Sequence, residues 1–146
     1  MVSFKRRIYQ SRRYWLVAGD INKEITLLEV PVTITDGYYL VGTMNGWQNA
    51  LNDPKTLVNQ YKLIAKGSEY VITLDVKAND EFKIVKVSNS NIVTWFAGNN
   101  NASGTNKSDT VEKGDNIKIL KNANITIYFT DYESADNAAK YWINVN

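Results

Sequence analysis

The sequence predicts an all-β protein, an antiparallel β-sandwich preceded by an extended basic N-terminal arm. Three observations predict it. Short segments rich in β-branched and aromatic residues recur along the chain, bounded by Gly, Asn or Asp. The chain is 44% hydrophobic and 12% aromatic, which excludes general disorder in 146 residues. All four arginines lie within the first thirteen residues.

The candidate strands follow one another with turn residues between them, as in a sandwich of antiparallel sheets. They cover residues 14–18, 25–34, 38–42, 69–76, 81–87, 92–96, 116–120, 124–130 and 140–145. Pro31 favours an edge or a bulge in the second of them. Residues 69–76 alternate clearly and place their apolar side chains on one face. Residues 81–87 alternate less clearly, which predicts a bulge or burial on both faces.

Helical signals are weak. Only residues 134–140 are expected to form a turn or two, with Ser134 as the N-cap. Residues 98–109 form the longest polar stretch and predict a surface loop.

The charge distribution separates two regions. The first thirteen residues carry five positive charges and no negative one, whereas the remainder holds 12 Lys against 15 Asp and Glu. We therefore predict a basic anchoring arm over residues 1–15 and a single β-sandwich domain over residues 16–146. Guanidinium groups suit an anchoring role because they form paired hydrogen bonds with acidic groups on a partner. The predicted anchoring residues are Lys5, Arg6, Arg7, Arg12, Arg13, Tyr14 and Trp15.

The composition leaves few routes to catalysis. The chain has no cysteine and no histidine, so disulfides, thiolate metal sites and Ser-His or Cys-His arrangements are excluded. No nucleophile or acid–base constellation is visible, and we expect no enzyme, no cofactor and no metal site. The N-terminus has no apolar segment typical of a secretion signal, and no run is long enough to cross a membrane. We therefore expect a protein made inside the cell, or a piece of a secreted parent.

Two tryptophans lie where a predicted strand runs into a loop, and both stand near asparagines. Trp47 ends the run YYLVGTMNGW, and Trp95 begins WFAGNN. An aromatic face can contact the apolar side of a sugar ring while amides bind its hydroxyls. The alternative is that these rings close the sandwich core, and we expect that role for Trp142.

Residues 38–145 resemble the small starch-binding modules of gut bacteria, both those attached to amylases and those of surface starch-binding proteins. The resemblance rests on YYLVGTMNGW, YKL, EYVITLDVKANDEFKIVKV, WFAGNN and the closing YFT and YWINV. It implies a sandwich of the immunoglobulin-like or carbohydrate-binding-module-like type. It also implies α-glucan contacts at Trp47, Trp95, Phe96, Asn99 and Asn100.

The arm lies outside this resemblance. Its basic and aromatic residues favour docking onto an acidic protein surface, while the absence of a nucleic-acid-binding motif makes nucleic acid an unexpected partner. We interpret the chain as a non-catalytic accessory protein that the arm fixes to a large assembly of capsid-type subunits, such as a phage capsid decoration protein on the virion surface. The alternative is a starch-binding or α-glucan-binding module of a secreted bacterial amylase or surface starch-binding protein, located outside the cell or on its surface.

Overall fold

The computed structural model describes residues 12–18, 21–27, 30–96, 102–104, 109–131 and 139–146. For residues 12–18, 21–27 and 102–104 it describes the backbone only. The chain divides into two compact units, residues 1–32 and 33–146, and each is described by itself. In the described ranges, no helix is both long and apolar enough to cross a membrane.

The first unit contains a two-stranded antiparallel sheet. β1 (Arg12–Ala18) pairs with β2 (Ile21–Leu27), with Arg12 opposite Leu27 and Ala18 opposite Ile21. The strand predicted at residues 14–18 is confirmed, but the next one lies earlier than the predicted range 25–34. β1 runs across residues 15 and 16, where the sequence analysis divides arm from domain, and that division stays a prediction. Lys5, Arg6 and Arg7 lie outside the described residues.

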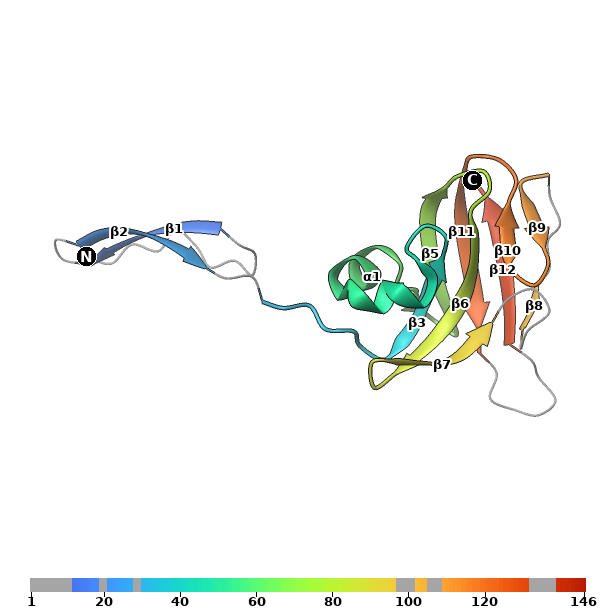
Figure 1. The fold of residues 1–146 in the computed structure, drawn as a ribbon, viewed down its shortest axis with the longest axis horizontal. Helices are drawn as coiled ribbons and strands as arrows, with labels where there is room; N and C mark the ends of the chain where they lie inside the picture. Colours follow the sequence, from blue (N-terminus) through green and yellow to red (C-terminus); the bar gives the residue numbers. More distant parts are fainter. Residues whose placement is uncertain (1–11, 19–20, 28–29, 97–101, 105–108, 132–138) are drawn as a thin grey trace. The chain divides into compact units, whose positions relative to one another are not determined.

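The second unit is a sandwich of two sheets (Figure 1). The first sheet contains β3 (Gly37–Gly42), β6 (Glu81–Ser88), β7 (Asn91–Phe96), β9 (Val111–Lys113) and β10 (Ile117–Ile119). The second has the order β4-β5-β11-β12-β8, from β4 (Ile64–Lys66), β5 (Glu69–Val76), β11 (Ala123–Thr130) and β12 (Ala139–Val145) to β8 (Ala102–Gly104). All pairings are antiparallel except that of β12 with β8. The predicted all-β antiparallel sandwich is confirmed.

The main core lies between the two sheets. Leu40 and Ile84 of the first sheet and Ile127 of the second are fully buried in it. Tyr38, Phe96 and Phe129 add an aromatic cluster at one end, with ring centroids 5.0 to 6.4 Å apart. The alternating apolar positions of β5 and β11 supply much of the second sheet's share of this core, as their sequence pattern predicts, and β12 supplies the rest.

The central strand β6 is buried on both faces. Phe82 and Ile84 face the main core, whereas Val85 and Val87 belong to a second apolar cluster on the outer face of the first sheet. The pairing of β6 with β7 also shifts register between Lys86 and Val87. The imperfect alternation predicts a bulge or burial on both faces. The burial is confirmed, and the register shift marks a bulge or another irregularity in the pairing.

A helical segment covers the outer face of the first sheet. A 3-10 helix, η1 (Trp47–Asn52), and the α-helix α1 (Pro54–Gln60) follow β3 (Figure 1). Ala50 and Leu57 are their buried residues, and both pack in the second apolar cluster with Tyr39. The sequence analysis did not predict these helices.

The expected helix at residues 134–140 lies largely outside the described residues. Its last two residues, Ala139 and Lys140, form the start of β12 and are therefore strand. The backbone there pairs with Thr130 of β11, which leaves no room for a helical turn at this end.

After α1 the chain joins both sheets. Leu63 donates its backbone N–H to the Tyr38 carbonyl, and Leu40 donates to the Tyr61 carbonyl, each at 2.9 Å. The segment therefore lies along β3 of the first sheet before it continues as β4 in the second. β4 and β8 are three residues long and stand at the two edges of the second sheet.

The second sheet packs its inner face in the main core and leaves large side chains exposed on its outer face. In β12, Tyr141 and Ile143 are buried in the main core, whereas Trp142 between them is 48% exposed. The expectation that Trp142 belongs to the core is therefore wrong. Successive side chains of a strand point to opposite faces, so two buried neighbours direct Trp142 outward.

Candidate functional site

The loop after β3 is held in one conformation by its own residues. The Asn45 side chain donates to the Leu40 carbonyl and accepts the Gly42 N–H, both at 2.9 Å. A Cβ at Gly42 would lie 2.1 Å from the Glu81 carbonyl oxygen, so only glycine allows β6 to approach this closely. The asparagine of the MNGW motif thus fixes the loop rather than remaining available for a ligand.

Trp47 begins η1 at the end of this loop. Its backbone has a φ of 58°, which is uncommon for a non-glycine residue, and it follows Gly46 with a φ of 82°. The ring is partly buried against the second apolar cluster. Trp47 therefore anchors η1 on the first sheet and places the polar residues that follow it.

Trp95 lies on β7, opposite Val85 of β6. Its ring is partly buried and packs against the second apolar cluster, as does Ile92 on the same strand. This packing restricts the orientation of the Trp95 ring, because a side chain held on one side by a core has few alternative rotamers.

A groove of about 370 Å³ runs between η1 and β7. It is lined by Gln48, Asn49, Leu51, Asn52, Asn91, Ile92 and Trp95. Every lining side chain is uncharged, and four of them are amides.

The amides of this groove retain hydrogen-bonding capacity. Those of Gln48, Asn49 and Asn52 are exposed and form no hydrogen bond with the described part of the chain, while Asn91 donates to the Asn89 carbonyl at 2.9 Å. An amide offers both donors and acceptors, as a hydroxyl-rich ligand requires. With the aromatic face of Trp95 beside them, the groove suits an uncharged ligand that has hydroxyl groups and an apolar face.

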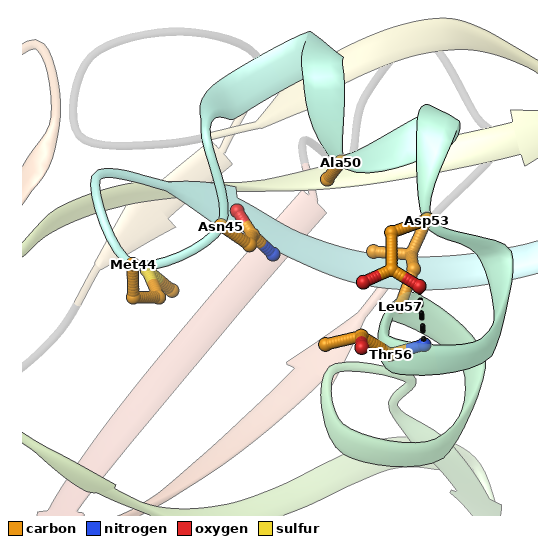
Figure 2. A pocket seen from close by; sticks show the side chains of 6 residues that line it. All are labelled: Met44, Asn45, Ala50, Asp53, Thr56 and Leu57. Carbon is orange, nitrogen blue, oxygen red and sulfur yellow. Dashed lines mark hydrogen bonds between the residues drawn. The ribbon is translucent and has the colours of Figure 1, made fainter.

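A smaller hollow of about 160 Å³ on the same helical segment has a different character (Figure 2). Asn45, Asp53 and Thr56 supply its polar groups, and all three serve the fold. Asp53 is the N-cap of α1 and accepts the Thr56 N–H at 3.2 Å, while Pro54 occupies the first turn. Hydrogen bonds from Thr56, first from its side chain and then from its backbone, hold the pKa of Asp53 below its usual value. The polar groups of this hollow therefore serve the capping and packing of the start of α1.

The sequence-predicted site residues separate in the structure. Trp47 and Trp95 both contact the second apolar cluster, and Trp95 lines the groove. Phe96 is buried in the main core at 4% exposure, next to Tyr38 and Phe129. Asn99 and Asn100 lie outside the described residues.

Sequence reasoning missed the groove's amides. The sequence does show an amide-rich stretch, Gln48, Asn49 and Asn52, directly after Trp47. Its pattern does not predict that this stretch forms a helix facing β7. Of the predicted anchoring residues, Arg12, Arg13, Tyr14 and Trp15 form the first part of β1, where only the backbone is described. Across the described ranges, no cluster of three or more acidic, His or Cys side chains could hold a metal ion.

Comparison with known proteins identifies one family. The family model described as "SusF, first starch specific CBM", where CBM denotes a carbohydrate-binding module, matches residues 33–146. The matched range coincides with the sandwich unit. No curated protein matches the chain. The match supports the starch-binding alternative of the sequence analysis and gives no support to a capsid role.

Proposed function

Since the chain belongs to the family of the first starch-specific carbohydrate-binding module of SusF, we propose that its sandwich unit binds the α-glucan chains of starch without cleaving them. The binding site is the groove between η1 and β7. Trp95 stacks on the apolar face of a glucose unit, and the amides around it hydrogen-bond the hydroxyls.

The observation that carries this proposal is the joint placement of Trp95 and four amides in one uncharged groove. A neutral polysaccharide has no charge to recognise, so affinity must come from ring contact and hydrogen bonds. Trp95 is restrained by its packing on the second apolar cluster, and η1 is fixed by Trp47. Such preorganisation limits the entropy lost on binding.

The site of action follows from the ligand. Because starch is an extracellular polymer for a bacterium that degrades it, we expect the protein outside the cell or on its surface. The first unit then serves as a connection to the surface or to a larger protein, and its basic residues remain candidates for that contact.

The test is Trp95→Ala. We expect affinity electrophoresis in amylopectin gels to show about tenfold weaker retention. An aromatic contact contributes up to about 1.5 kcal/mol beyond the area it buries, and about 1.4 kcal/mol corresponds to a tenfold change in affinity. Val93→Ala is the matched control, because Val93 lies on the same strand, is 54% exposed and does not line the groove. A folded Trp95→Ala protein that is retained as strongly as the unaltered chain would refute the groove as the site.

A further inference from the structure

The outer face of the second sheet displays an apolar row that crosses four strands. Ile64 of β4 pairs with Val71 of β5, Val71 with Tyr128 of β11, and Tyr128 with Trp142 of β12. Directly paired residues share a face, so these side chains form a continuous line. Ile64 is 61% exposed at one end and Trp142 48% exposed at the other.

A polar row lies beside it, formed by Thr73, Thr126 and Asn144 in register. The Thr73 and Thr126 hydroxyls are 2.8 Å apart, and the Asn146 amide donates to Thr126 at 2.9 Å. Asn144 in turn donates to the Asn146 side-chain oxygen at 2.9 Å. These bonds fix the polar row, so its hydroxyl and amide groups have set positions.

The two rows together have the same chemistry as the groove. An exposed tryptophan stands beside hydroxyl and amide groups, and neither row contains a charge. A shallow hollow of about 420 Å³ adjoins the rows at the β4 end, where Lys66 also lines it beside Ile64 and Val71. Four strands about 4.8 Å apart give a track roughly 14 Å long, which suits an extended chain rather than a compact molecule.

We propose that this face is a second carbohydrate-binding surface, which takes an uncharged, extended glycan chain. Trp142 and Tyr128 supply the stacking surface, and the exposed Thr73 and Asn144 at the two ends of the polar row supply the contacts to hydroxyls, while Thr126 between them is buried. The lack of charge in both rows matches a neutral polymer. This surface stands on observations independent of the groove.

The test compares single and double variants for retention in amylopectin gels. We expect Trp142→Ala to weaken retention about three- to tenfold, and to weaken it again in the Trp95→Ala background, because two sites on one polymer reinforce each other. Trp142→Phe should be retained more strongly than Trp142→Ala, whereas Trp142→Leu should not, because only Phe supplies a flat ring. Leu120→Ala is the control, because Leu120 is 42% exposed and belongs to neither surface.

The outcomes separate the two proposals. If Trp95→Ala has no effect but Trp142→Ala does, the groove is wrong and the second surface stands. If Trp142→Ala, shown to be folded by circular dichroism, is retained as strongly as the unaltered chain in both backgrounds, the second surface is refuted. A change in oligomeric state by sedimentation for Trp142→Ala, without a change in retention, would identify the face as a protein interface and also refute the proposal.

Discussion

The two sheets of the sandwich differ in how their outer faces are used. The first sheet has its outer face covered by η1 and α1, so Tyr39, Val41 and Val85 are completely buried there. The second sheet leaves Trp142 and Ile64 exposed on its outer face. In the first sheet, the covering element itself forms one wall of the groove proposed to bind the ligand. In the second, the strands alone present their side chains.

Because of this difference, substitutions on the two outer faces should affect folding stability and ligand binding to different extents. A residue beneath the helical cover contributes to both, because it positions η1 as well as filling the core. A residue on the open face can contribute to binding with little effect on folding. Substitutions at the two faces should therefore give different patterns of effect.

The largest expected effect is that of Leu57→Ala under the cover. Leu57 is 1% exposed, and truncating a buried leucine costs about 2–5 kcal/mol in the free energy of unfolding. The loss should also weaken starch retention because η1 and α1 share this packing. Ile64→Ala on the open face is the comparison, with an expected cost below about 0.5 kcal/mol. Equal losses in urea unfolding would contradict the division between the faces.

A smaller but clear effect is expected for Gly42→Ala at the end of β3. Its Cβ would meet the Glu81 carbonyl oxygen at 2.1 Å and the Phe82 Cβ at 2.6 Å. Such overpacking costs about 1–3 kcal/mol. Gly114→Ala is the control, because its nearest contact would be an ordinary 3.6 Å. If chemical denaturation gives the same midpoint for both variants, the close approach of β3 and β6 is not a constraint.

The smallest effect concerns pH and the start of α1. Hydrogen bonds from Thr56 lower the pKa of Asp53 in the folded protein from its ordinary value of 3.8. The ionised carboxylate therefore stabilises the fold fully at pH values above 3.8. This contribution is lost as pH falls through the lower, folded-state pKa. Asp53→Asn keeps a capping oxygen but cannot ionise. The stability difference between the two proteins should therefore shrink from neutral pH to strongly acidic pH. A difference that stays constant in urea titrations would contradict the assignment of this cap.

Much of the second sheet could be predicted from the sequence. In β5 and β11 every second residue is apolar and faces the core, a pattern that marks a sheet with one face packed on the core, although Val71 and Tyr128 add apolar side chains on the other face. The same rule, applied to Tyr141, Trp142 and Ile143, would have placed Trp142 outside. A tryptophan between apolar neighbours suggests core by composition alone, whereas its position between two buried residues of a strand directs it outward.

The helical cover could not be read from apolar periodicity. η1 and α1 bury few side chains, chiefly Ala50 and Leu57, which is too weak a pattern to identify a helix. The signal present was local, an Asp53 cap followed by Pro54. Because the sequence pattern does not predict η1, it gives the groove beside β7 no second wall. Trp95 is then the one groove residue that the sequence identifies.

The short strands at the edges of the second sheet bear on how closely many molecules can gather. β4 and β8 each offer only three residues to a neighbouring backbone, too few to template intermolecular strand pairing. If copies gather along one glycan polymer, the edges of this sheet therefore disfavour strand pairing between neighbouring modules.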